Sequence, residues 1–168
     1  MPGASTAHGS GDIFLSVQTK RAGKVKGESS VPGHEDEIAV SSWRWAVQAS
    51  SSLGATAATA RRSYSGLTVV KAIDSASTAL LSALATNDEV KESVLTMRKS
   101  GGEAVDYFFI KLKEARVTQI EHSTNEHGEA SEVVTFAFRK VEVEYRRQES
   151  SGGRGASSVF TDEIVPSA

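Results

Sequence analysis

A change of phase in the alternation of apolar and polar residues is the feature of this sequence that most limits its fold. Successive side chains of a β-strand point to opposite faces of the sheet, so apolar residues at every second position form one buried face. Between residues 132 and 147 the apolar positions are first even and then odd, at Val134, Phe136, Phe138, Val141 and Val143. We therefore expect a strand that bends at Arg139-Lys140 and serves both sheets of a two-layer β structure.

The segment 38–48 shows the same change of phase. Its apolar residues lie at even positions up to Val40 and at odd positions from Trp43 onward. This pattern predicts either a bulge or a strand that passes between two sheets. Other alternating segments predict further strands at residues 13–17, 67–73, 90–98 and 104–121.

A single segment has the period of a helix. Residues 74–77 offer N-cap side chains, Leu80, Leu81 and Leu84 then fall on one helical face, and Asn87 follows as a stop signal. The residues alone thus predict a mainly β fold, which is a small antiparallel barrel or sandwich with one helix attached.

Composition divides the chain into one domain and two tails. The 168 residues, of which 39% are hydrophobic and 24% charged, have the size and composition of a single globular domain. Gly, Ser, Ala and Thr are abundant in three segments, residues 1–11, 49–66 and 149–158. Segments of this composition bury too little apolar surface to offset the entropy lost when the chain becomes ordered. We expect a flexible tail at 1–11, a domain at 12–147 that includes the loop 49–66, and a Ser/Gly-rich tail at 148–168.

Charge and hydropathy limit the partners and the location of the protein. The net charge of −2 leaves no basic excess to neutralise phosphates, which argues against binding to nucleic acid or to an anionic membrane. The sequence has no cysteine and no apolar run long enough to cross a bilayer. Its first ten residues lack the apolar core of a signal peptide, so we expect a cytoplasmic protein unless other machinery exports it.

Motifs of catalysis are missing from the sequence. We find no nucleophile elbow, phosphate-binding loop or paired-carboxylate spacing. His122 and His127 lie near glutamates in the polar stretch 122–130, which we expect to be a loop that cannot hold metal ligands in place. We therefore assign no catalytic, cofactor-binding or metal-binding residue and do not expect an enzyme.

Short stretches spread over residues 11–147 share their order and spacing with a known family. They are Gly11-Asp12-Ile13-Phe14-Leu15, Lys26-Gly27-Glu28-Ser29, Gly33-His34-Glu35-Asp36-Glu37-Ile38, Ser42-Trp43-Arg44-Trp45, Ile73-Asp74 with Leu80-Leu81-Ser82-Ala83, Met97-Arg98-Lys99-Ser100-Gly101-Gly102, Ile110-Lys111-Leu112-Lys113-Glu114 and Val141-Glu142-Val143-Glu144-Tyr145. Together they resemble the Hcp family, the haemolysin-coregulated proteins that form the inner tube of bacterial type VI secretion systems.

The resemblance implies an antiparallel two-sheet β-barrel with one flanking α-helix and an extended loop. It implies homohexameric rings that stack as a hollow tube, like a phage tail tube, inside a contractile sheath and behind a VgrG-like spike protein. Sheath contraction would expel the tube from the bacterial cytoplasm to the extracellular space or a target cell, without a cleaved signal peptide. Effector proteins would be carried or chaperoned in the lumen, whereas nucleic acid and membrane insertion would have no part.

The resemblance also implies roles for particular residues. The segment 21–37 would be an arm that reaches a neighbouring subunit and the next ring through Lys24, Lys26, Glu28, His34, Glu35, Asp36 and Glu37. Arg44 would face the lumen and contact cargo, or else be only a solvated arginine. Tyr107 and Phe109, on the outward face of their strand, would contribute to the ring interface. Large aromatic side chains bury much apolar area, so we expect a core with Trp43, Trp45, Phe136 and Phe138.

Two alternatives to a tube subunit are open. The ring could chiefly chaperone one effector, with the Ser/Gly-rich tail as its tether. An enzyme of unknown type is disfavoured, because the roughly twenty residues after Tyr145 are too few to bury a catalytic core.

Overall fold

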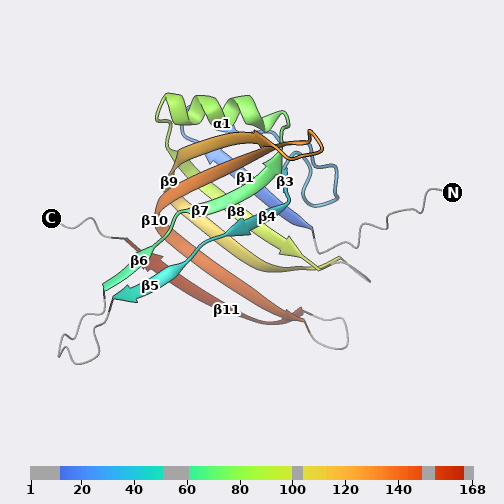
Figure 1. Cartoon of the computed structure of the whole chain (residues 1–168). Coiled ribbons are helices and arrows are strands. Elements are labelled where there is room, and N and C mark those ends of the chain that lie inside the picture. The colour runs from blue at the N-terminus through green and yellow to red at the C-terminus, as the bar shows by residue number, and fades with distance from the viewer. Residues whose placement is uncertain (1–11, 51–60, 100–103, 149–153, 165–168) are drawn as a thin grey trace.

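Eleven strands and one helix make up the part of the chain that the structure describes (Figure 1). The computed structural model describes residues 12–50, 61–99, 104–148 and 154–164. In chain order the elements are β1 (Ile13–Thr19), β2 (Gly23–Lys24), β3 (Ile38–Val40), β4 (Ser42–Arg44), β5 (Val47–Ser50), β6 (Arg61–Tyr64), β7 (Leu67–Ala72), α1 (Ala76–Ala85), β8 (Val90–Arg98), β9 (Asp106–Thr124), β10 (Ala130–Gln148) and β11 (Arg154–Glu163).

Nine of the strands form one antiparallel sheet. Its order is β2-β1-β8-β9-β10-β7-β4, with β3 added to β1 and β11 added to β10, while β5 and β6 form a separate two-stranded ribbon. Helix α1 lies across one end of this sheet, and the β5–β6 ribbon extends from the other end (Figure 1). The prediction of a mainly β, antiparallel fold with one helix is confirmed.

The paired strands of the described residues do not close into a complete barrel. The segment 38–44 spans the opening instead, because β3 pairs with β1 and β4 pairs with β7, with only Ser41 between them. Of the two predicted alternatives, a bulge or a passage between two sheets, the segment comes nearer to the second, although it passes between two parts of one sheet. The prediction of a single strand over 38–48 is wrong, because the change of partner divides the segment into β3, β4 and β5.

The bend expected at Arg139-Lys140 is present in β10, and β9 has a bend that was not predicted. The buried positions of β10 change from even to odd between Phe138 and Val141, and those of β9 change between Leu112 and Ala115. Glu114 lies opposite the predicted bend and has a φ of 49°, which is uncommon for a residue other than glycine. Beyond the bend, β9 and β10 therefore present the opposite set of side chains to the core.

The hydrophobic core lies between the curved sheet and α1. Leu80 of the helix is completely buried, whereas Leu81 is 41% exposed, so the predicted apolar face of the helix is correct only in part. The start of the helix is held by Asp74, whose Oδ1 accepts the N–H of Ala76 at 2.9 Å. The fully buried apolar side chains come from strands of every part of the sheet and include Leu15, Ile38, Leu67, Leu95, Ile110, Leu112 and Phe136.

Two segments that were expected to be irregular contain strands. The polar stretch 122–130 is mostly hairpin, since β9 continues to Thr124 and β10 begins at Ala130. In the turn between them, Oδ1 of Asn125 accepts the N–H groups of His127 and Glu129. Local polarity predicted a loop here, but pairing between two long strands overrides it.

The C-terminal region contains the larger correction. Strand β11 pairs with β10 from Lys140 opposite Glu163 to Gln148 opposite Arg154, so the prediction of a tail over 149–158 is wrong for residues 154–158. The open edge of β10 supplies hydrogen-bond partners that the composition of the segment cannot indicate. The division into a domain at 12–147 and tails at 1–11 and 148–168 stays a prediction.

Parts of other predictions fall outside the described residues. Strands β5 and β6 occupy both ends of the expected loop 49–66, and residues 51–60 are not described. The turn at 100–102 and the tail at 1–11 also lie outside the described residues. Among the described residues, no helix has the length and apolar character needed to cross a membrane.

Candidate functional site

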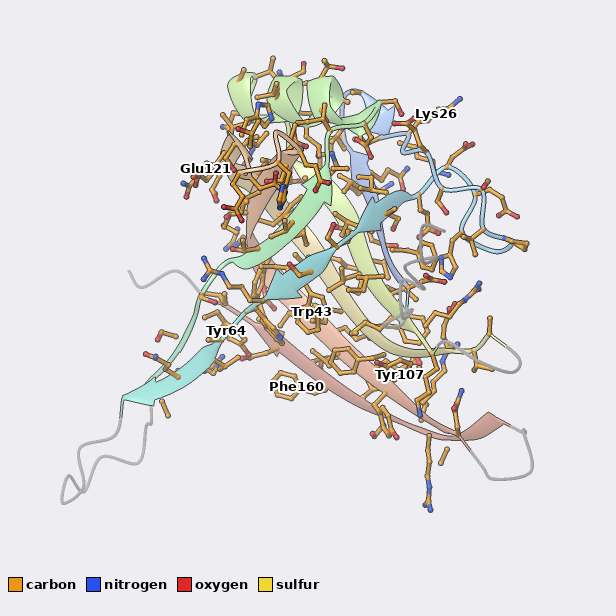
Figure 2. All side chains as sticks on the ribbon, turned by 45° about the vertical axis from the view of Figure 1, so that its right-hand side comes forward. Lys26, Trp43, Tyr64, Tyr107, Glu121 and Phe160 are labelled. Carbon is orange, nitrogen blue, oxygen red and sulfur yellow. The ribbon has the colours of Figure 1, made fainter. Side chains whose placement is uncertain are left out.

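The arm at residues 21–37 folds back on itself beside the sheet (Figure 2, near Lys26). Its two halves are joined by backbone hydrogen bonds from Gly27 to Asp36 at 2.8 Å and from Ser29 to Glu37 at 3.0 Å. Gly27 lies so close to the opposite half that an added Cβ would overlap the carbonyl of Glu37. The two halves of the arm can therefore approach this closely only with glycine at this position.

His34 anchors the arm to the sheet. It is only 6% exposed and stacks on Phe14 with ring centroids 4.2 Å apart. Its Nδ1 lies 2.9 Å from Oε2 of Glu37, and its Nε2 lies 2.9 Å from Oδ2 of Asp106 in β9. Oδ1 of Asp106 in turn accepts a hydrogen bond from Arg98. His34 and Glu37 thus make contacts within the chain that the sequence does not indicate.

The tip of the arm carries two exposed carboxylates. The backbone N–H groups of Glu35 and Gly33 lower the pKa of Glu35, and Oε1 of Glu35 accepts the Gly33 N–H at 3.0 Å. Asp36 is exposed and has a φ of 62°. Aspartate tolerates this left-handed conformation better than most residues. Lys24 is exposed at the base of the arm.

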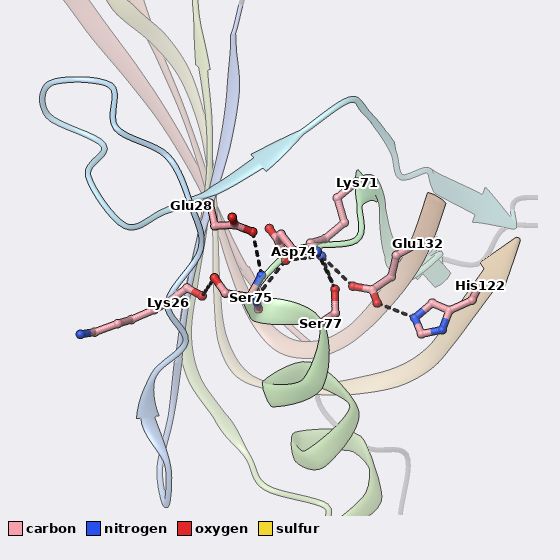
Figure 3. Close-up of polar contacts among 9 residues, drawn as sticks. Lys26, Glu28, Lys71, Asp74, Ser75, Ser77, His122 and Glu132 are labelled. Atoms are coloured by element: carbon pink, nitrogen blue, oxygen red, sulfur yellow. Dashed lines mark hydrogen bonds and ion pairs between the residues drawn. The ribbon is translucent and has the colours of Figure 1, made fainter. Parts of the chain in front are cut away.

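A second anchor joins the arm to the start of α1 (Figure 3). Oε2 of Glu28 accepts the backbone N–H of Ser75 at 2.8 Å, and Oγ of Ser75 donates to the carbonyl of Lys26 at 3.2 Å. A carboxylate at a helix N-terminus is favoured by the helix dipole. The side chain of Lys26 points away from these contacts (Figure 3).

A buried ionic cluster lies behind this anchor (Figure 3). The side chains of Lys71 and Glu132 are fully buried, with Nζ of Lys71 2.7 Å from Oε1 of Glu132 and 2.8 Å from Oδ1 of Asp74. Oε2 of Glu132 lies 2.5 Å from Nε2 of His122. Burial acts to raise the pKa of Glu132, but the hydrogen bonds from Lys71 and His122 outweigh it, so the pKa is lowered.

The sequence contains a signal for this cluster. Lys71 follows Leu67 and Val69 in phase, and Glu132 precedes Val134 in phase, so each charge occupies a core-facing position. The two residues are direct partners in the ladder between β7 and β10. His122 is thereby engaged with a carboxylate, and no metal-ligand cluster is found within the described residues.

A third cluster joins the β5–β6 ribbon to β11. The guanidinium of Arg62 and the hydroxyl of Tyr64 both donate to the carboxylate of Asp162, with Nη2 of Arg62 at 2.7 Å and the tyrosine oxygen at 2.6 Å. The hydrogen bond from Arg62, and after it the one from Tyr64, lowers the pKa of Asp162 to about 2. Burial and the contact with Asp162 raise the pKa of Tyr64 to about 12.

The ribbon cluster predicts a dependence of stability on pH. The unfolded-state pKa of an aspartate is about 3.9, so ionised Asp162 stabilises the folded chain above that pH. This stabilisation is lost as the pH falls toward the folded-state value of about 2. The difference in unfolding free energy between the wild type and Asp162→Asn should therefore be constant near neutral pH and shrink below about pH 4. Denaturant unfolding at a series of pH values checks this, and a difference that grows in acid would contradict it.

The other predicted site residues lie on strands of the sheet. Phe136 and Phe138 are buried. Trp43 and Trp45 are partly exposed and pack against the core, Trp43 beside Phe108 and Trp45 beside Tyr64. Arg44 is exposed on β4, on the face opposite Trp43.

Tyr107 and Phe109 lie at the outer face of β9. Each is partly exposed and is covered by a cation, since Nζ of Lys99 is 5.3 Å from the ring of Tyr107 and Cζ of Arg146 is 4.3 Å from the ring of Phe109. Such contacts are typical of cation–π interactions.

Comparisons with known proteins identify relatives over most of the chain. The model of the family described as "Type VI secretion system effector, Hcp" matches residues 14–145. Protein hcp1 of Pseudomonas aeruginosa is 32% identical over 154 residues, which are 88% of this chain and 91% of that protein.

Solved structures share the fold. The Hcp1 protein from the E. coli EAEC 042 pathovar has a TM-score of 0.75 at 20% identity, and the alignment covers 90% of this chain and 98% of that one. A type VI secretion system effector from Yersinia pestis has a TM-score of 0.72 at 24% identity, covering 91% of this chain and 100% of that one. At these identities the likeness shows the fold alone.

Proposed function

Because the chain belongs to the Hcp family of type VI secretion system proteins, we propose that it is the subunit of the inner tube. Six copies form a ring, rings stack into a hollow tube, and contraction of a surrounding sheath expels the tube behind a VgrG-like spike protein. The protein thereby leaves the bacterial cytoplasm and carries effector proteins in the lumen. The observation that carries the proposal is the family match over residues 14–145.

Exposed apolar side chains support assembly with further copies. In the described residues, three of the six exposed large apolar side chains lie on β10 and β11, where Tyr145 is 44%, Val159 56% and Phe160 52% exposed. A monomer rarely leaves neighbouring large apolar side chains in water, and a ring would cover them. We place the ring interface on these residues together with the outer-face aromatics Tyr107 and Phe109.

Arg44 and the arm complete the proposed surfaces. Arg44, exposed on β4, would line the lumen and present a ring of guanidinium groups to cargo. Lys24, Lys26, Glu35 and Asp36 are exposed charges of the arm and would contact a neighbouring copy. His34, Glu37 and Glu28 would act indirectly, by holding the arm in place through their contacts with Asp106 and Ser75.

The oligomeric mass tests the proposal. Purified protein should elute as one species with the mass of six 17.8 kDa chains, and electron microscopy should show rings. A stable monomer at micromolar concentration by light scattering would refute ring assembly. In cells, the protein should reach the medium only when the sheath is intact, and secretion that persists after sheath deletion would refute export through this system.

A further inference from the structure

His34 is held between two carboxylates where the arm meets the sheet. Its Nδ1 faces Oε2 of Glu37 in the arm, and its Nε2 faces Oδ2 of Asp106 in β9, each at 2.9 Å. These three residues define the histidine clamp. An ionised carboxylate can only accept a hydrogen bond, and a neutral imidazole carries a hydrogen on one nitrogen alone. Both contacts are therefore satisfied together only when both ring nitrogens carry a hydrogen, as in the charged form of histidine.

Burial makes this second hydrogen important. The ring of His34 is only 6% exposed, and Phe14, itself 2% exposed, stacks on it with the two planes 2° from parallel. A ring nitrogen that lost its hydrogen would keep its lone pair against a carboxylate oxygen, with little water to separate the two. Two acceptors that face each other in a buried site lose their hydrogen bond and are not compensated by solvent.

The charged groups around His34 come from the arm, β8 and β9, whereas β1 contributes the uncharged ring of Phe14. They are Glu37 of the arm, with Glu35 and Asp36 between it and His34 in the chain, Arg98 of β8 and Asp106 of β9. Arg98 already donates to Oδ1 of Asp106 at 3.0 Å. One guanidinium thus faces two carboxylates, so the charge of protonated His34 is needed to make the histidine clamp neutral.

The histidine clamp is continuous with the hydrogen bonds that close the arm. The backbone N–H of Ser29 donates to the carbonyl of Glu37 at 3.0 Å, and that of Gly27 donates to the carbonyl of Asp36 at 2.8 Å. Glu37 therefore joins the two halves of the arm through its backbone and reaches His34 through its side chain. Loss of the contact between Glu37 and His34 would loosen the segment on which the first half of the arm is paired.

We propose that the histidine clamp is a pH-sensitive device, in which protonated His34 holds the arm against the sheet and loss of the proton releases it. The inference concerns contacts within one chain, so it goes beyond the proposed function and does not depend on assembly. The proton is present on the acid side of the titration of His34. The arm is therefore held on that side and is released as the pH rises through the titration.

Hydrogen exchange of the arm tests the device. The amides of Gly27 and Ser29 donate the two bonds that close the arm, so their exchange, corrected for the intrinsic effect of pH, reports its release. As His34 loses its proton, this exchange should become at least about tenfold faster, the factor expected when a hydrogen bond to a charged group is lost. Exchange of the imidazole C2 hydrogen, followed by mass spectrometry, gives the titration of His34 in the same sample. The two midpoints should coincide, and arm exchange that stays constant while His34 titrates would overturn the proposal.

Two variants separate the effect of the proton from that of packing. An amide can present either an N–H or an oxygen, so Asp106→Asn should satisfy Nε2 in both forms of His34. The arm of this variant should stay closed at every pH, without the step in exchange. His34→Gln has no group that titrates in this range, so it should show no step either. A step that persists in either variant, or an arm that is open at every pH in Asp106→Asn, would overturn the proposal.

His127 provides the matched control. It lies in the turn between β9 and β10, and its side chain is 76% exposed. His127→Gln removes a histidine outside the histidine clamp, so the step in arm exchange should be the same as in the wild type. Loss of the step in this variant would place the titrating group outside the histidine clamp and overturn the proposal, while the tube proposal would stand or fall by the oligomeric mass alone.

Discussion

Replacing Lys71 with methionine is expected to lower the free energy of unfolding by about 3–5 kcal/mol, because it leaves a buried carboxylate without its ion-pair partner. The side chains of Lys71 and Glu132 are both fully buried, and Nζ of Lys71 also bonds Asp74 and Ser77. Methionine has a similar length, so the loss reflects charge more than a cavity. Denaturant unfolding measures the difference, provided that the dependence of the unfolding free energy on denaturant concentration has the same slope in both proteins.

The pH dependence of the Lys71→Met effect separates charge from packing. In the wild type the pKa of Glu132 is lowered, so ionised Glu132 stabilises the fold above its unfolded-state pKa of about 4.3. That contribution is lost as the pH falls through the folded-state value. In Lys71→Met, His122 remains to oppose the effect of burial, which raises the pKa of Glu132. The carboxyl group of Glu132 is therefore expected to take up a proton more readily than in the wild type. The difference between the two proteins should therefore shrink in acid, and a difference that is constant with pH would contradict a charge effect.

A double variant completes this experiment. Lys71→Met/Glu132→Leu removes both charges and should be closer to the wild type than the sum of the single variants predicts, by about 0.5–3 kcal/mol. Replacing both members of a buried ion pair with apolar residues often costs little stability, whereas removing one member leaves an uncompensated buried charge and costs much more. Additive effects would show that the two residues do not act as a pair.

Replacing Phe136 with alanine is expected to lower the free energy of unfolding by about 3–5 kcal/mol, because it leaves a cavity in the core. Phe136 is completely buried on β10, in the section that pairs with β7 and β9. The matched control is Phe160→Ala on β11, because Phe160 is 52% exposed. As a surface substitution it should change the free energy of unfolding by no more than about 0.5 kcal/mol.

The same two variants also distinguish folding from assembly. Phe136→Ala should unfold at lower denaturant concentration and still assemble when folded, because its side chain does not reach the surface. Phe160→Ala should keep its stability and weaken ring formation if β11 is part of the ring interface. Equal loss of stability in both variants, measured by denaturant unfolding, would contradict the burial of these two side chains.

Local periodicity in the sequence determined the bends of the sheet. The even-to-odd change after Phe138 predicted where the buried side chains of β10 change from one face of the strand to the other. The buried side chains of β9 change faces at the partner position beside Glu114. The change after Val40 predicted a bulge or a change of sheet, and in the structure the chain passes there from pairing with β1 to pairing with β7. Such features depend on alternation within a few residues, which a sequence displays directly.

Strand β11 and the interior charges depended on partners far away in the sequence. The Ser/Gly-rich composition of 149–158 indicated a tail, yet the open edge of β10 orders residues 154–158 as part of β11. Lys71 and Glu132 are 61 positions apart, and His34 and Asp106 are 72 apart. Nothing local to either residue of such a pair identifies its partner.

The sequence by itself determined the family, the mainly β fold, the single helix and the position of the arm, because these follow from short motifs and local periods. Only the tertiary structure separated the buried charges of the arm from the exposed ones. It buried His34 against Phe14 with Glu37 beside it, and it left Glu35 and Asp36 exposed at the tip. The physical reason is that burial, and with it the role of a charge, is set by what the rest of the fold packs against each side chain.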